Sequence, residues 1–191
     1  MILWKFITTK IVKIKDDGNL SQKKFCNFVF IMILNDTNPI VQLNLPRTNL
    51  EVARNAAGRL MVYDRWRGRR VILTPEEWVR QNFVAMLVEY KGYVSGRIAN
   101  EITISLNGTS KRCDTVVYDD AMRPLMIIEY KSPEIKITQS VFDQIARYAI
   151  VLRAPYLTVS NGLTHYCCRI NYENESYSFL SDIPQYNQII R

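Results

Sequence analysis

The stretch at residues 124–135, PLMIIEYKSPEI, constrains the fold of this chain more than any other. Its four consecutive apolar residues, 125–128, predict a strand that enters a hydrophobic core. Glu129 and Lys131 follow, and because strand side chains alternate between faces, the two charges share one face. Charged side chains are rarely buried unless they are paired or bind a metal ion. The stretch therefore predicts a core strand that carries a carboxylate and an ammonium group at its end.

The flanking sequence predicts the elements around this strand. Thr74 fits a helix N-cap, Pro75 fits the first helical position, and Glu77 fits the capping-box position, with Gly92 as the stop. Two short strands precede this helix, and three strands, a second helix, a strand and a hairpin follow it. The expected ranges are 59–64, 69–73, 101–106, 112–118, 125–131, 138–152, 156–160, 165–171 and 176–180. The order α-β-β-β-α-β plus a C-terminal hairpin predicts an α/β fold, with a mixed central sheet flanked by helices.

The 191 residues suffice for one domain with its own core. Composition changes near Asn38-Pro39, so we expect an N-terminal extension over 1–40 and a folded domain over 41–191. The apolar segment 25–34 is too short for a bilayer, which needs about 20 residues, and it lacks a signal-peptide cleavage site. The four cysteines show no zinc-ligand spacing. We therefore expect reduced thiols, a cytoplasmic location and no membrane partner.

A second carboxylate is expected beside Glu129. In a hairpin with a loop over 119–124, Tyr118 faces Leu125 and Asp114 faces Glu129. Opposed residues lie about 5 Å apart, and two carboxylates that close share a proton or bind a cation. An oxygen-rich site without histidine suits Mg²⁺ or Mn²⁺, completed by water and a substrate phosphate.

Lys131 adds a group that orients or deprotonates water, or stabilises charge on a phosphate. Together these residues favour phosphodiester hydrolysis. The alternative is that Glu129 and Lys131 form only a surface ion pair, without a catalytic role. Gln144 lies in the apolar stripe of the second helix, one turn before Tyr148. A glutamine there predicts either a partner at the site or an amide satisfied by backbone.

The segment 59–70 carries five arginines and two aromatic residues, and the chain has a net charge of +7. A basic excess favours a polyanionic partner, because guanidinium groups bind phosphate oxygens and aromatic rings stack on bases. The alternative, of equal weight, is a solvated hairpin tip. The candidate DNA-binding residues are Arg65, Arg67, Arg69 and Arg70.

These residues occur in an order that resembles a known family. Asp114, fourteen residues, and then Glu129-Tyr130-Lys131 resemble the PD-(D/E)xK nuclease motif. Gln144 and Tyr148 resemble the QxxxY element of type I restriction enzymes. Over about residues 41–184, the segments LTPEEWVRQNF, KRCDTVVYD, IEYKSPEI, FDQIARYAIVLRAPYLTVSNG and HYCCRINYE are similar to small proteins related to the N-terminal nuclease domain of the R subunit.

The resemblance implies a restriction-endonuclease-like core and a metal-dependent DNA endonuclease. It implies that Asp114 and Glu129 bind Mg²⁺, helped by the Tyr130 carbonyl, and that Lys131 is the catalytic lysine. DNA is then the substrate, and a protein subunit is a further candidate partner.

The resemblance also implies roles for both helices. Gln144 and Tyr148 would contact DNA or orient the lysine. An acidic residue of the first helix would complete the metal site, with Glu77 as the first choice and Glu76 as the next.

Two departures keep other functions open. Cys113 stands where proline is common in this fold, and the chain has no GxxxxGK[ST], so no ATP-driven motor is expected. The main alternative is a catalytically idle nucleic-acid-binding or accessory protein that keeps the nuclease fold. A third, a structural or membrane-surface protein, rests only on residues 1–34.

Overall fold

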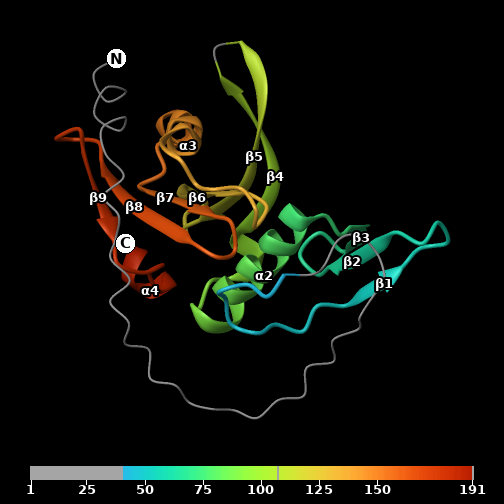
Figure 1. Ribbon diagram of the computed structural model, residues 1–191. Coiled ribbons are helices and arrows are strands. Elements are labelled where there is room, and N and C mark those ends of the chain that lie inside the picture. The colour runs from blue at the N-terminus through green and yellow to red at the C-terminus, as the bar shows by residue number, and fades with distance from the viewer. Residues whose placement is uncertain (1–40, 107, 191) are drawn as a thin grey trace.

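The computed structural model describes residues 41–190 except Asn107 (Figure 1). The predicted extension over 1–40 lies outside the described residues. The elements are β1 (Val52–Arg54), β2 (Leu60–Asp64), β3 (Arg69–Ile72), α2 (Pro75–Tyr90), η1 (Ser95–Arg97), β4 (Ile98–Leu106), β5 (Thr109–Tyr118), β6 (Pro124–Tyr130), α3 (Gln139–Leu152), β7 (Tyr156–Ser160), β8 (His165–Asn171), β9 (Ser176–Leu180) and α4 (Tyr186–Ile189). The predicted α/β order is confirmed from α2 to β9, while β1, η1 and α4 were not predicted.

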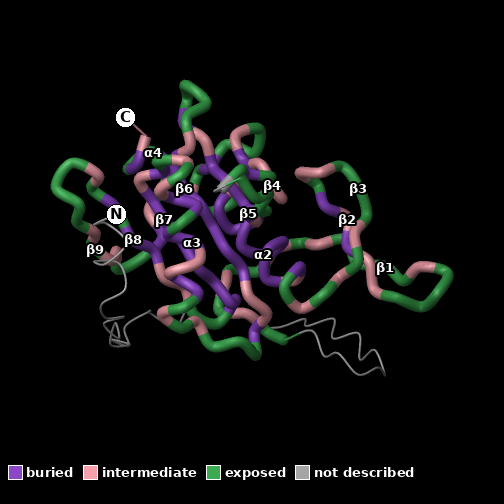
Figure 2. The backbone as a smooth tube through the Cα atoms, turned by 90° about the horizontal axis from the view of Figure 1, so that it is seen from above, coloured by how far each residue is buried: buried purple, intermediate pink, exposed green. Residues whose placement is uncertain are grey.

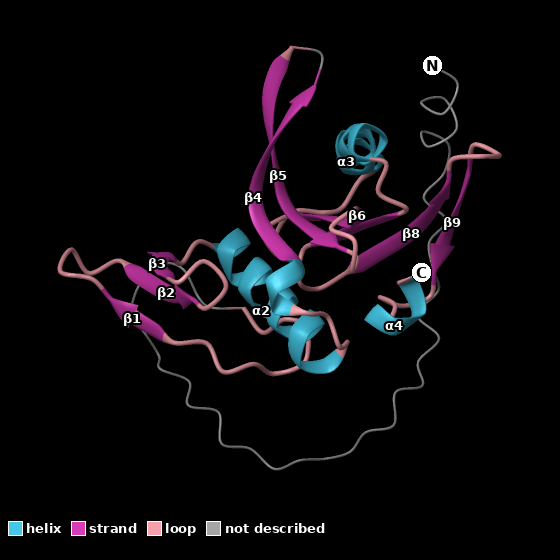
Figure 3. Cartoon of the chain, turned by 180° about the vertical axis from the view of Figure 1, so that it is seen from behind, coloured by secondary structure: helices cyan, strands magenta, loops and turns pink. Residues whose placement is uncertain are grey.

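Within the described residues the strands form two sheets. The central sheet has the order β4-β5-β6-β7-β8-β9, and it is mixed because β6 and β7 run parallel. The smaller sheet, β1-β2-β3, is antiparallel and lies beside α2 (Figure 3). None of the described helices is long and apolar enough to cross a membrane.

The two long helices cover opposite faces of the central sheet. Val79 and Phe83 of α2 pack with Met126 and Ile128 of β6 in one core cluster. Ile127 of β6 packs against α3 in the other. Strands β6 and β7 lie buried between these layers (Figure 2). Because strand side chains alternate, Glu129 shares the face of Ile127, which α3 covers.

The pairing of β5 with β6 decides how the acidic residues meet. Thr115 pairs with Ile128, and one further step in this register places Asp114 opposite Glu129, as predicted. The expected pairing of Tyr118 with Leu125 is wrong, because the register shifts after Val117 and Tyr118 pairs with Pro124. The irregularity lies at the loop end of the hairpin, so the register at the acidic end is unaffected.

Candidate active site

Three charged side chains meet where β5 and β6 run side by side. The Lys131 Nζ lies 2.8 Å from Glu129 Oε1. The backbone N–H of Tyr130 donates to Asp114 Oδ2 over 2.9 Å, which fixes this carboxylate against β6. The backbone N–H of Lys131 donates to the Ser160 carbonyl over 2.9 Å. Backbone hydrogen bonds to two neighbouring strands therefore hold these groups in place.

Helix α3 contributes a fourth residue. Gln144 Nε2 donates to Glu129 Oε1 over 3.1 Å, so the polar residue in the apolar stripe has a partner at the site. Tyr148, one turn further on, is buried in the apolar cluster between α3 and the sheet. We call Asp114, Glu129, Lys131 and Gln144 the open cluster. The catalytic roles of its members and of Tyr148 stay predictions.

The electrostatics of the open cluster are those of crowded carboxylates. Glu129 is only 4% exposed, and burial, followed by the charge of Asp114, raises its pKa to about 7. Burial also raises the pKa of Asp114, against the lowering effects of the Tyr130 hydrogen bond and of Lys131. Burial alone would lower the pKa of Lys131, but the hydrogen bond and charge of Glu129 raise it. Both carboxyls therefore resist ionisation while the lysine stays charged.

One oxygen of the open cluster is well suited to bind a divalent cation. Glu129 Oε2 is buried and has no hydrogen-bond partner among the described residues. An unsatisfied carboxylate oxygen in the interior is costly, and a hard cation would satisfy it. Within the described residues, no group of three or more His, Cys, Asp or Glu side chains forms a ready-made metal site. Water and substrate oxygens would complete the coordination, as Mg²⁺ commonly requires.

The two glutamates predicted on the first helix lie in different environments. Glu76 is solvent-exposed, yet partial desolvation of its carboxyl, followed by the charge of Asp114, raises its pKa. Glu77 instead accepts from Gln81 Nε2 over 2.7 Å and pairs with Arg67 over 3.0 Å and with Arg80. Glu76, not Glu77, therefore belongs to the electrostatic field of the open cluster.

The capping box is formed only in part. The Thr74 hydroxyl accepts from the Glu77 backbone N–H over 3.1 Å, as predicted. The Thr74 backbone N–H, which the Glu77 carboxylate was expected to cap, donates to the Ile72 carbonyl. The arginine partners hold the Glu77 carboxylate, which favours a structural role for Glu77, and its metal role stays a prediction.

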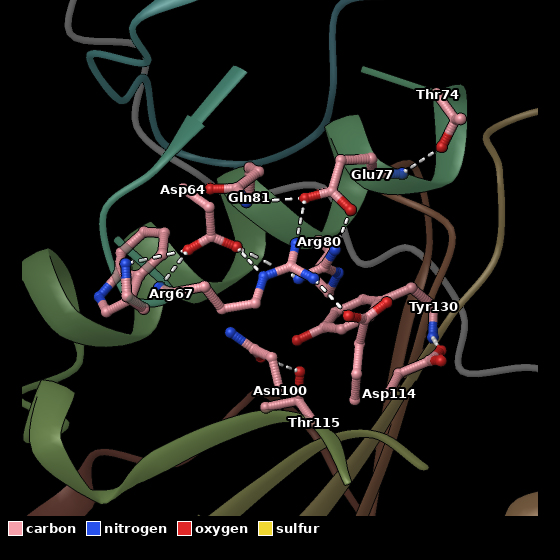
Figure 4. A network of polar contacts seen from close by, with 12 residues as sticks. Asp64, Arg67, Thr74, Glu77, Arg80, Gln81, Asn100, Asp114, Thr115 and Tyr130 are labelled. Atoms are coloured by element: carbon pink, nitrogen blue, oxygen red, sulfur yellow. Dashed lines mark hydrogen bonds and ion pairs between the residues drawn. The ribbon is translucent and has the colours of Figure 1, made fainter. Parts of the chain in front are cut away.

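A second group of charges, which we call the closed network, joins the smaller sheet to α2. It consists of Asp64, Arg67, Glu77 and Arg80, gathered beside Tyr130 in Figure 4. Asp64 is fully buried, and its Oδ1 accepts from the backbone N–H groups of Trp66 and Arg67, both over 2.9 Å. Burial alone would raise the pKa of Asp64, but the backbone and guanidinium hydrogen bonds of Arg67 lower it.

The four arginines predicted to bind DNA differ in their exposure and in their partners. Arg67 is only 13% exposed and pairs with three carboxylates, so a phosphate contact does not fit its position. Arg65 stacks over Trp66 and pairs with Glu89 over 2.7 Å. Arg70 lies over Tyr63 and pairs with Glu51. Arg69, at 62% exposure, is the most open of the four.

A cleft of about 410 Å³ lies beside Asp114, and three of the predicted arginines, Arg67, Arg69 and Arg70, line it. Arg112 and Glu101 also line this cleft, and neither was predicted as a site residue. The sequence did hold a signal for Arg112, because it lies two residues before Asp114 and strand residues two apart share a face. No comparable local signal marks Glu101.

Comparison with known proteins shows the family of this chain. The family described as Type I restriction enzyme R protein N terminus (HSDR_N) matches residues 75–184. The chain therefore belongs to this family, and the matched segment contains the whole open cluster. A comparison with curated proteins gave no match.

Among solved structures, the chain is similar to a fragment assigned as an HsdR subunit of a type I restriction enzyme from Vibrio vulnificus YJ016. The two are 18% identical, with a TM-score of 0.46, over 61% of this chain. The match covers 24% of the Vibrio chain, so this protein corresponds to about a quarter of that structure's length.

Proposed function

We propose that this protein is a metal-dependent DNA endonuclease that hydrolyses phosphodiester bonds at the open cluster. The observation that carries the proposal is the pair of crowded carboxyls, Asp114 and Glu129, with a buried and unpartnered oxygen on Glu129. Membership of the R-subunit N-terminal family and the net charge of +7 support DNA as the substrate.

Asp114 and Glu129 would hold Mg²⁺ or Mn²⁺. Glu76 of α2 interacts electrostatically with both carboxyls. The metal, when bound, supplies Lewis-acid polarisation of a phosphate oxygen and lowers the pKa of a bound water. Gln144 keeps the Glu129 carboxylate in one orientation by its hydrogen bond.

Lys131 acts as a cation rather than a base in this proposal. Because Glu129 raises the pKa of Lys131, its ammonium form dominates near neutral pH. An ammonium group at this place stabilises negative charge that develops on the phosphate. Of the two roles expected for the lysine, the electrostatics favour charge stabilisation over deprotonation of water.

Nicking of supercoiled plasmid in Mg²⁺ tests the proposal. Asp114→Asn and Lys131→Met should each lower the rate by about 10³-fold, the scale expected for lost electrostatic stabilisation. The chain offers a matched control, because Glu134 and Lys136 repeat the Glu-x-Lys pattern on exposed residues. Lys136→Met should leave the rate within about twofold. Cleavage that survives both site substitutions would contradict the proposal.

The second candidate is a catalytically idle protein that binds DNA or serves a partner subunit. The observation that favours it is that no three potential metal ligands come together within the described residues. Binding of duplex DNA without cleavage in Mg²⁺ or in Mn²⁺ would establish this candidate instead.

A further inference from the structure

Glu101 lines the cleft and has an unusual backbone conformation. It lies within strand β4, yet its φ is +57°, a left-handed conformation that costs free energy for any residue with a Cβ. On either side of it Asn100 pairs with Thr115 and Ile102 pairs with Cys113, so no residue is inserted. This unbroken register places Glu101 opposite Asp114. The strained backbone therefore sits directly beside the proposed metal site.

The carboxylate of Glu101 binds three arginines, and it binds them unequally. Arg67 is close, with 2.6 Å between its Nη1 and Glu101 Oε2. Arg69 and Arg112 are farther away, at 3.4 and 3.6 Å. Carboxylate–guanidinium hydrogen bonds are about 2.7–2.9 Å long, so Arg67 anchors Glu101 while the other two are held loosely.

Exposure separates the same arginines. Arg69 and Arg112 are 62% and 66% exposed, whereas Arg67 is 13% exposed. Ion pairs between exposed groups contribute little net free energy, so Arg69 and Arg112 can exchange partners at small cost. The lining of the cleft carries five arginines and four carboxylates, a net charge of +1, which becomes +2 without Glu101.

We infer that, in the DNA-free protein, the Glu101 carboxylate occupies the position that a DNA phosphate takes when substrate binds. Glu101 holds Arg69 and Arg112 at the cleft beside Asp114, and substrate binding exchanges its carboxylate for a phosphodiester oxygen at these two guanidinium groups. Glu101 therefore lowers the affinity for nucleic acid in the resting protein while it keeps the arginines in place. This inference rests on the proposed function, and it adds the residues that receive the substrate backbone.

The test is fluorescence anisotropy with a labelled duplex of about 20 base pairs, in Ca²⁺ to avoid cleavage. Glu101→Gln should tighten binding by about tenfold while the salt dependence changes by less than about two phosphate contacts, because Arg69 and Arg112 contact phosphate in both complexes and each contact contributes roughly 0.9 to the slope. The matched control is Asp182→Asn, which also removes one exposed carboxylate but frees only Lys91, a residue that does not line the cleft. It should change the affinity by less than about twofold.

Two further variants keep the result interpretable. Glu101→Gly removes the carboxylate and accepts a positive φ, so it should show the same gain even if Glu101→Gln folds poorly. In an Arg69→Gln/Arg112→Gln background the gain should disappear.

Wild type that binds DNA while neither Glu101 variant binds more tightly would overturn this inference alone. A gain that persists without Arg69 and Arg112 would also overturn it, because net charge would then be the cause. If none of the proteins binds DNA, the proposed function is overturned and this inference with it.

Discussion

The closed network and the open cluster each combine an aspartate and a glutamate with cationic side chains, but in different proportions. In the closed network Asp64 and Glu77 each bind two guanidinium groups, and Asp64 has a lowered pKa. In the open cluster, Lys131 is the one cation among the described residues that pairs with Glu129, whose pKa is raised to about 7. Paired charges satisfy one another, whereas unpaired buried carboxylates are costly unless they are protonated or bind a cation. The difference favours a structural role for the closed network and supports the catalytic role proposed for the open cluster.

The largest effect is expected from Glu129→Gln. The amide fills nearly the same volume but cannot supply a charged ligand, so plasmid cleavage should fall by about 10³-fold, or about 4 kcal/mol in the activation barrier. Initial rates in Mg²⁺ measure this. Glu134→Gln is the matched control on the exposed Glu-x-Lys copy and should leave the rate unchanged. Equal rates for Glu129→Gln and wild type would remove the open cluster from catalysis.

Substitutions in the closed network should lower the stability of the fold rather than the rate of cleavage. Asp64→Ala leaves Arg80 and the turn at Trp66 without a fully buried acceptor, so the free energy of unfolding should fall by about 3 kcal/mol. Urea denaturation measures the loss. Glu89→Gln, which breaks an exposed ion pair, should cost less than about 1 kcal/mol. If the two losses were equal, burial would not be what distinguishes the closed network.

The two regions should also differ in the sign of their pH dependence. The pKa of Glu129 is raised from 4.5 to about 7, so its contribution to stability is present below about pH 4.5 and is lost as pH rises through 7. The full loss is at most about 3 kcal/mol, at 1.4 kcal/mol per pKa unit. The pKa of Asp64 is lowered from 3.8, so its contribution is present above pH 3.8 and is lost on further acidification.

Urea unfolding between about pH 5 and pH 8 measures this contrast. The difference in stability between Glu129→Gln and wild type should grow across this interval in favour of the variant. A constant difference would mean that Glu129 ionises normally in the folded protein.

The smallest effect is stabilisation by Mg²⁺ alone. At a concentration about ten times its dissociation constant, Mg²⁺ should stabilise the protein by about 1.4 kcal/mol. The effect should be larger at pH 8 than at pH 6, because protons compete with the metal for Glu129. Thermal unfolding measures it. Asp114→Asn should abolish the effect while Glu134→Gln should retain it, and an equal shift in both variants would place the metal elsewhere.

Much of the open cluster was predictable because its signals are local. The apolar run before Glu129 indicated a buried strand, and the hairpin register brought Asp114 to it. Gln144 stood out as a polar residue in an apolar stripe, and the structure gives it the Glu129 carboxylate as a partner. Each of these inferences needed only strand alternation or helical spacing.

Local sequence signals could not decide between Glu76 and Glu77 as the acidic residue of the metal site. Neighbouring helix residues point about 100° apart, so only the docking of α2 decides which carboxylate faces the cluster. The burial of Arg67 was unpredictable for the same reason, since its sequence context resembles that of Arg65 and Arg69. Its burial depends on Asp64, Glu77 and Glu101, which come from three different elements.

The sequence by itself determined which residues occupy the strand end and which face each shares, because backbone periodicity sets both. Only the tertiary structure decided how the charges pair. Ion pairing depends on distances between β2, α2, β4 and β5 that no local pattern encodes. The packing of these elements closed one set of charges around Asp64 and left the carboxylates at Asp114 and Glu129 in excess.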